Sequence, residues 1–134
     1  MDDILQRLPH RPPFVMIDSI APYEGGAVAR FRIDAQNVLV CDGFFSESGL
    51  IENMAQAAGA GLPRDPVGDS PSLGYIGALK DVHIEKLPRA GETITTEVRY
   101  LNQVLSVHLA QASVRDSNGL LLASCELKIF LQPS

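Results

Sequence analysis

Two polar side chains stand four residues apart in a stretch that otherwise has the pattern of a buried helix. The stretch is residues 46–61, SESGLIENMAQAAGAG, and the two side chains are those of Glu52 and Gln56. Because residues four apart share one face of a helix, the carboxylate and the amide would lie together. A positioned carboxylate can take or give a proton. The plainer alternative, that Glu52 is an ordinary solvated helix glutamate, stays open on this stretch alone.

The helix itself is predicted from its spacing and its ends. The apolar residues at helical spacing are Leu50, Ile51, Met54, Ala55 and Ala58. Ser46 or Ser48 can cap the start, and Pro63 stops the helix. Ala55 and Gly59 continue a stripe of small residues, which lets another backbone approach. We therefore expect Glu52 to lie either at a site or at a subunit contact.

The histidines and cysteines do not show the spacing of a metal site. His10, His83 and His108 are far apart and far from Cys41 and Cys125, so we predict no metal. His10 is expected to be structural, and the other two to be surface or sheet-face histidines. Cys125 should be an inert core thiol and Cys41 a more accessible one, both reduced, although a disulfide stays open.

The remaining pattern is mostly β. A short helix is predicted over residues 2–8 and strands over 14–20 and 27–34, followed by an irregular approach, 35–45, to the helix. A surface loop follows over 62–72, and then strands over 73–84, 94–100, 104–116 and 121–131. Asn118-Gly119 marks the last hairpin, and Gly74 and Gly77 suggest a bulge or a close approach by a ligand. This order predicts an α+β fold, in which one antiparallel sheet wraps around one long central helix in a single domain, residues 1–134.

Composition excludes several classes of function. The chain has 134 residues, of which 46% are hydrophobic and 20% charged, and its net charge is −5. The acidic balance, with no basic run, argues against nucleic acid as a partner. No signal-peptide core and no apolar run near the ~18 residues of a membrane span are present. The expected compartment is the cytoplasm.

Two motifs carry a resemblance to a known family. Residues 8–14, LPHRPPF, followed by Ile17-Asp18, and residues 52–58, ENMAQAA, resemble the (3R)-hydroxyacyl-ACP dehydratases. Gly74–Lys80 and Pro88–Glu92 are similar to the third strand and the following turn of that family. The resemblance covers nearly the whole chain. It implies a hotdog fold, a homodimer that joins two sheets edge to edge, and reversible loss of water from a 3-hydroxyacyl thioester.

One position departs from the family pattern. In the family, a histidine in a Gly-His-Phe/Leu-Pro-Gly setting precedes the helix and works with the helix glutamate of the other subunit. The chain is most similar to the short-looped dehydratase-like proteins of aryl-polyene pathways, in which the setting is Asp-Gly-His-Leu-Pro-Gly. In this chain, residues 42–47 are DGFFSE, so Phe44 stands in the place of the histidine. Glu52 matches the family's catalytic carboxylate.

The resemblance implies the remaining parts of a site. Catalysis would rest on Glu52, with Gln56 orienting the carboxylate or the substrate hydroxyl. The thioester carbonyl would be held by backbone N–H groups near Ser48 and Gly49 and by that of Gly77. The expected walls of an acyl tunnel, which could instead be plain core, are Phe44, Phe45, Leu50, Met54 and Ile76. No cofactor is implied. The carrier would be acyl carrier protein or CoA, with Arg64, Lys80, Lys86 and Arg89 as a candidate docking patch.

Three functions therefore stay open. The first is a dehydratase in which Glu52 works with an unusual partner or with a histidine from a second hotdog subunit in a heterodimer. The second is a hotdog thioesterase, in which Glu52 activates water. The third is a non-catalytic acyl-binding or partner subunit.

Overall fold

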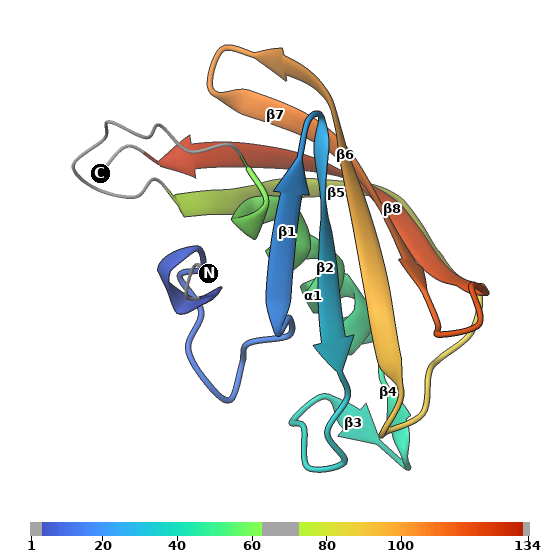
Figure 1. Ribbon diagram of the computed structural model, residues 1–134. Helices are drawn as coiled ribbons and strands as arrows, with labels where there is room; N and C mark the ends of the chain where they lie inside the picture. Colours follow the sequence, from blue (N-terminus) through green and yellow to red (C-terminus); the bar gives the residue numbers. More distant parts are fainter. Residues whose placement is uncertain (1–3, 63–72, 133–134) are drawn as a thin grey trace.

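The chain folds as one long helix held in a curved antiparallel sheet (Figure 1). This computed structural model describes residues 4–62 and 73–132. The elements in order are η1 (Ile4–Gln6), β1 (Ser19–Tyr23), β2 (Gly26–Arg32), β3 (Val40–Cys41), β4 (Phe44–Phe45), α1 (Glu47–Ala60), β5 (Leu73–Ile84), β6 (Thr93–Val104), β7 (Val107–Arg115) and β8 (Leu121–Gln132). The loop predicted over 62–72, together with Arg64, lies almost entirely outside the described residues.

The sheet has six strands in the order β1-β2-β6-β7-β8-β5, and every neighbouring pair is antiparallel. β1 and β5 are the edges. The sheet curls so that one face wraps around α1, which packs against β2 and all four later strands (Figure 1). This is the α+β hotdog arrangement that the resemblance implies, and the prediction of the fold class is confirmed.

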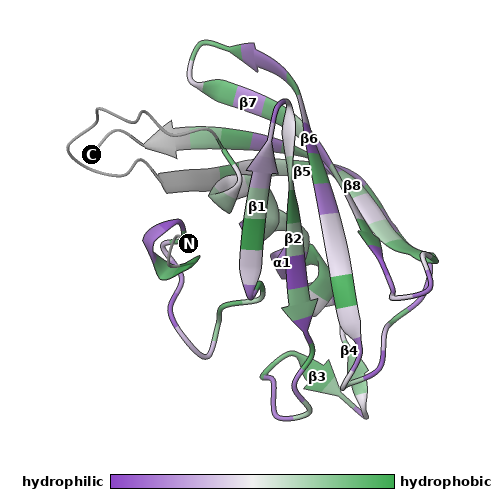
Figure 2. Ribbon diagram, in the orientation of Figure 1, coloured by the Kyte–Doolittle hydropathy of each residue, from purple (hydrophilic) through white to green (hydrophobic). Residues whose placement is uncertain are grey.

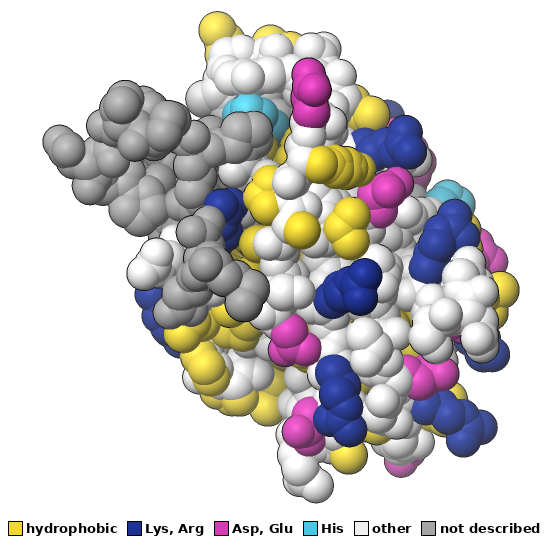
Figure 3. Space-filling model, viewed as in Figure 1, with side chains coloured by type: hydrophobic (Ala, Val, Ile, Leu, Met, Phe, Trp, Pro, Cys, Tyr) yellow, Lys and Arg dark blue, Asp and Glu magenta, His cyan; other side chains and the backbone are white. Residues whose placement is uncertain are grey.

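Strand alternation explains which face meets the helix. In β2, Ala27, Ala29 and Phe31 are buried, whereas Arg30 and Arg32 are exposed. The same two-residue period recurs in the first half of β6, in β7 and in β8, and Figure 2 shows hydrophobic and hydrophilic positions alternating along the strands. Because successive side chains point to opposite faces, each of these strands gives one apolar face to the helix. The opposite face carries interspersed charges of both signs on the side seen in Figure 3.

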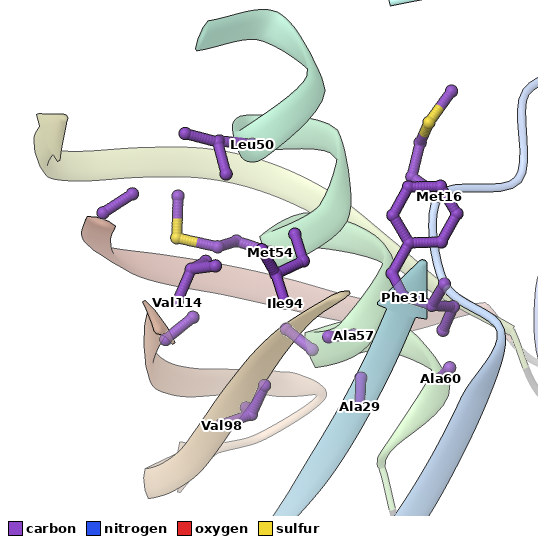
Figure 4. Close-up of a cluster of buried hydrophobic side chains, with 14 of the residues drawn as sticks. Met16, Ala29, Phe31, Leu50, Met54, Ala57, Ala60, Ile94, Val98 and Val114 are labelled. Atoms are coloured by element: carbon purple, nitrogen blue, oxygen red, sulfur yellow. The ribbon is translucent and has the colours of Figure 1, made fainter. Parts of the chain in front are cut away.

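The helix begins where one of the two predicted caps placed it. Ser46 is the N-cap, and its hydroxyl accepts a hydrogen bond from the Gly49 N–H at 3.1 Å. Leu50 and Met54 are fully buried and point toward the strands, near Ile94 and Val114 (Figure 4). The second half of the helix is nearly all alanine and glycine, so the sheet can lie close to it.

One face of α1 is not covered by this sheet. Ser48 is exposed, and Ile51, Glu52 and Ala55 are half-buried, while the rest of the helix after Ser48 is buried. These four residues are three or four positions apart along the chain (48 to 51 and 52, then 51 and 52 to 55), which places them on one helix face. We call this face the open stripe. It carries a single charge, that of Glu52.

The sequence prediction was wrong at the N-terminal side. Residues 14–18 do not form a strand: β1 starts at Ser19, and Met16 and Ile17 are buried in irregular backbone. A short apolar run does not separate a buried strand from a buried loop. Of the helix predicted over residues 2–8, the described part from Ile4 onward forms the single turn η1. The irregular approach contains the small β3–β4 hairpin. Of the two glycines at which a bulge or a close approach by a ligand was expected, Gly77 lies at a register shift between Ile76 and Ala78, whereas Gly74 pairs in register with Leu131.

Phe45 anchors the start of the helix. It is fully buried, its ring lies 5.6 Å from the Phe31 ring, and a β-carbon at Gly49 would lie 2.6 Å from it. We predict that Phe45→Ala lowers the free energy of unfolding by about 3–5 kcal/mol, the usual cost of deleting a buried aromatic ring. Urea denaturation measures this change. Phe14→Ala is the control, because Phe14 is 60% exposed and its loss should cost less than about 0.5 kcal/mol. Equal losses in both variants would contradict this packing.

Candidate functional site

Glu52 is the centre of the candidate site. Its side chain is 47% exposed on the open stripe, and two polar groups approach one of its oxygens. The Gln56 Nε2 donates to Glu52 Oε2 at 3.3 Å, and the His10 Nε2 lies 3.8 Å from the same oxygen. The four-residue spacing thus places the amide beside the carboxylate, as expected for one helix face.

Gln56 is only 1% exposed and makes more bonds than the sequence indicated. Its Oε1 accepts from the Met16 N–H at 2.6 Å, and its Nε2 donates to the Phe14 carbonyl at 2.9 Å. The amide therefore replaces a strand partner for backbone that has none, since buried backbone groups must be paired. Its contact with Glu52 is the weaker of its two donated bonds by length.

Asn53 is a residue that the sequence reasoning missed. It is fully buried, and its Nδ2 donates to the Met16 carbonyl at 2.8 Å. Its Oδ1 accepts from the Thr96 hydroxyl of β6. Asn53 and Gln56 together bind both sides of Met16, so residues 14–16 are fixed between helix and sheet. The signal was available: a second amide sits three residues before Gln56 among apolar neighbours.

His10 reaches the site from a loop that Arg11 holds in place. The Arg11 guanidinium donates to the carbonyls of Leu5, Leu8 and His10 at 3.2, 2.9 and 2.7 Å. Leu8 is buried in the core, so this loop is anchored. The His10 Nδ1 is buried and has no hydrogen-bond partner among the residues the structure describes. A purely structural role was expected for this histidine, and its proximity to Glu52 was not predicted.

Phe44 fills the position where the resemblance leads one to expect a histidine. It is half-buried, and the Arg89 guanidinium lies 5.2 Å from the ring centroid. Phe44 and Arg89 also form an isolated β-bridge. An arginine over an aromatic face is attracted by the ring quadrupole, so the ring is held by a cation and by backbone pairing.

The other expected substrate contacts are divided between the core and the surface. Leu50, Met54 and Phe45 are fully buried in the core, and the Met54 sulfur lies 3.7 Å from that of Cys125. In the single protomer these three side chains pack against protein. Ile76 is half-buried on β5, and Gly77 is exposed beside the Phe130 ring.

The backbone N–H groups expected to bind the thioester carbonyl differ in whether they already donate a hydrogen bond. The Gly49 N–H already donates to the Ser46 cap. Ser48 precedes it at the exposed start of the helix, where N–H groups lack intrahelical acceptors. Gly77 is the residue left out of the β5–β8 register.

A cleft of about 360 Å³ lies on the N-terminal side of the molecule. Its lining residues are Ile4, Leu5, Pro12, Pro13, Val15, Ile17 and Asp18. It is thus formed by the N-terminal loop rather than by the helix and the sheet. The Asp18 carboxylate accepts from the N–H of Arg32, the last residue of β2, at 2.7 Å.

The two remaining histidines lie on the sheet, as predicted. His83 is exposed on β5, and His108 is half-buried on β7. Burial lowers the pKa of His108 below its ordinary value, so the imidazole is neutral at physiological pH. Within residues 4–62 and 73–132, no cluster of three or more His, Cys, Asp or Glu side chains is arranged to hold a metal, and no helix is long and apolar enough to cross a membrane.

The chain is similar in sequence to known acyl-carrier-protein dehydratases. The 3-hydroxyacyl-[acyl-carrier-protein] dehydratase FabZ of Tolumonas auensis is 28% identical over 138 residues, covering 95% of this chain and 91% of the relative. FabZ of Rhizobium johnstonii is 34% identical over 107 residues, covering 72% and 66%.

Solved structures share the fold at low sequence identity. The dehydratase heterocomplex ApeI:P from Xenorhabdus doucetiae matches with a TM-score of 0.78 and 17% identity, covering 98% of this chain and 91% of the other. The smu.793 protein from Streptococcus mutans, bound to acetyl CoA, matches with a TM-score of 0.72 and 13% identity, covering 95% and 97%.

The fold and these relatives define a dehydratase-like protein of the hotdog class. More specifically, the family described as ApeP-like, ApeP dehydratase, matches residues 2–134, and the chain belongs to this family.

Gln56 offers a direct test of how the site is held. We predict that Gln56→Leu lowers the free energy of unfolding by about 1–3 kcal/mol, because the Met16 N–H and the Phe14 carbonyl are left without partners. Hydrogen exchange at the Met16 amide should accelerate before global unfolding. Gln36→Leu, at an exposed loop position, should leave both quantities unchanged. Unaltered Met16 protection in the Gln56 variant would refute this arrangement.

The two thiols should react very differently. Burial, with a smaller effect from Glu126, raises the pKa of Cys125 to about 11, whereas Cys41 is exposed. At pH 8 only about a thousandth of Cys125 is thiolate, the reactive form. We predict that iodoacetamide labels Cys41 in the folded protein and labels Cys125 only after denaturation, as read by mass spectrometry. A Cys41→Ser variant that still takes up label when folded would count against this burial.

Proposed function

We propose that this protein acts in the removal of water from 3-hydroxyacyl thioesters and that Glu52 transfers a proton in that reaction. The observation that carries the proposal is the position of Glu52. It is the only charged residue of the open stripe, and the only other charged residue of the helix, Glu47, lies at its exposed start. Its carboxylate is held by Gln56 but remains 47% exposed, so a substrate can reach it.

The reaction needs two proton-transferring groups. One takes a proton from C2 of the acyl chain, and the other gives a proton to the hydroxyl that leaves C3 as water. The electron pair of the C2–H bond becomes the second bond between C2 and C3. Glu52 supplies one of these groups. The thioester carbonyl, on which negative charge develops, would be bound by the backbone N–H groups of Ser48 and Gly77, with Gly49 available only if its cap bond opens.

A second subunit would complete the site. The open stripe is an uncovered helix face with Ile51 and Ala55 on it, and β5 leaves one edge of the sheet without a partner strand. Uncovered helix faces and free strand edges are the places where another chain adds. The partner is a second copy or a different hotdog subunit. The ApeI:P heterocomplex among the similar folds supports the second arrangement.

The substrate would arrive as a thioester of acyl carrier protein or of CoA. The relatives are named for acyl-carrier-protein substrates, which favours the carrier protein. Three members of the expected basic patch are described. The Arg89 guanidinium lies over the Phe44 ring, and Lys80 and Lys86 are exposed. The acyl chain would run along Ile76 and Phe44 at the subunit contact.

The test is to identify the product and then to remove the carboxylate. The protein, alone and as any complex that co-purifies from its own cells, is given 3-hydroxyacyl and saturated acyl thioesters, and products are read by mass spectrometry. We expect enoyl thioester, and we expect Glu52→Gln to lower kcat by at least about 10²-fold.

Glu47→Gln is the matched control, because Glu47 is an exposed residue of the same helix. It should keep kcat within about threefold. Free acid as the product would instead support the thioesterase alternative. Unchanged substrate would support a non-catalytic subunit, and full turnover by the Glu52 variant would show that Glu52 is not the acid–base group.

A further inference from the structure

An imidazole lies beside Glu52 within the same protomer, although the family position for it holds phenylalanine. The His10 Nε2 is 3.8 Å from Glu52 Oε2, and the two side chains are 34% and 47% exposed. The distance exceeds a direct hydrogen bond. It leaves room for a water or a reacting group to bridge the two, and catalytic contacts are often long before substrate binds.

The imidazole is placed by contacts on both sides of it. On one side, Arg11 ties the carbonyls of Leu5, Leu8 and His10 together. On the other side, Gln56 and Asn53 hold Phe14 and Met16 to the helix that carries Glu52. Hydrogen bonds therefore connect the loop that carries His10 to the helix that carries Glu52. A histidine on a freely moving loop would not be positioned for proton transfer.

The two ring nitrogens of His10 have different surroundings. A structural histidine usually satisfies its ring nitrogens on backbone groups. In this protein the Nδ1 is buried without a partner in the described part of the chain, and the other nitrogen faces a carboxylate. The Nε2, which faces the carboxylate, is therefore the nitrogen available for proton transfer.

We propose that His10 is the second acid–base group of the site, so that the imidazole absent at Phe44 is supplied by the N-terminal loop of the same protomer that carries Glu52. This inference rests on the proposed dehydration. It makes each protomer's proton-transfer pair complete in itself, while a second subunit is still needed to enclose the acyl chain.

The steps balance as follows. The neutral His10 Nε2 takes the proton from C2, the C2–H electron pair forms the C2=C3 double bond, and the C3–O bond breaks. Glu52, in its carboxylic acid form, gives its proton to the departing oxygen, which leaves as water. The imidazolium then returns its proton to the carboxylate, directly or through one water, and the pair is restored. Hydration of the enoyl thioester is the same sequence reversed.

The experiment compares variants at His10 with a histidine that lies elsewhere. His10→Gln and His10→Asn replace the ring, and His108→Gln on β7 is the control. We expect both His10 variants to keep their fold by circular dichroism and to lose about 10²–10⁴-fold in kcat, with KM changed less than threefold. Their remaining activity should also lose the acid limb of the wild-type pH profile. A merely structural loss would scale the profile without changing its shape.

A second measurement tests the pairing without activity. In Glu52→Gln, the ring ¹⁵N resonances of His10 should shift, while those of His108 should not. Unchanged ring ¹⁵N chemical shifts of His10 in Glu52→Gln would overturn the pairing.

The outcomes separate this inference from the proposed function. If His10 variants retain kcat within threefold while Glu52→Gln loses it, the dehydration stands and the role of His10 is refuted. If the wild type yields no enoyl product, or Glu52→Gln is fully active, the proposed function fails and the inference falls with it. If neither His10 variant folds, His10 is structural and the proposal is overturned.

Discussion

The arrangement of the site depends on how the backbone at Met16 is bonded. This segment runs between helix and sheet but belongs to neither, so its N–H and carbonyl have no ladder to join. Asn53 and Gln56 replace that ladder with side-chain amides, inside a region that is otherwise apolar. A buried amide network is stabilising only when all its members are paired. The Thr96 hydroxyl completes the set by bonding to Asn53.

This bonding has a consequence for the neighbouring chemistry. Four residues after His10, the Phe14 carbonyl accepts a hydrogen bond from Gln56, which lies one helical turn beyond Glu52. Fixing the chain there limits how far His10 can move from the carboxylate. The apolar core and the proton-transferring groups are thus coupled through Gln56, which is buried and yet touches the exposed carboxylate. A change that loosens the amide network should affect both stability and proton transfer.

The parts that sequence reasoning could predict are those with strong local patterns. The extent of α1 followed from a cap, helical spacing and glycine at its end, and β5 to β8 followed from two-residue alternation and the Asn118-Gly119 turn. The segment 14–18 was mistaken for a strand because its apolar residues are buried for another reason, the amide bonds from Asn53 and Gln56. Glu52 and Gln56 could be singled out because they are four residues apart, a spacing that places both side chains on one helix face. The proximity of His10 could not, because no local pattern relates residues 42 positions apart in a loop and a helix.

Phe44 gives the last reason to look for the imidazole elsewhere. Its ring lies beside the Arg89 guanidinium and its backbone forms a β-bridge with that of Arg89, and a phenyl ring cannot transfer a proton. Acid–base catalysis depends on where two groups lie in space, and the same pair can be assembled from different positions in the chain. The helix still offers its carboxylate to the open stripe, and the N-terminal loop offers an imidazole to the same oxygen. Glu52 is reachable from solvent, is held by the Gln56 amide and lies beside the His10 imidazole, so these residues provide the two groups that an acid–base reaction needs without a histidine at position 44.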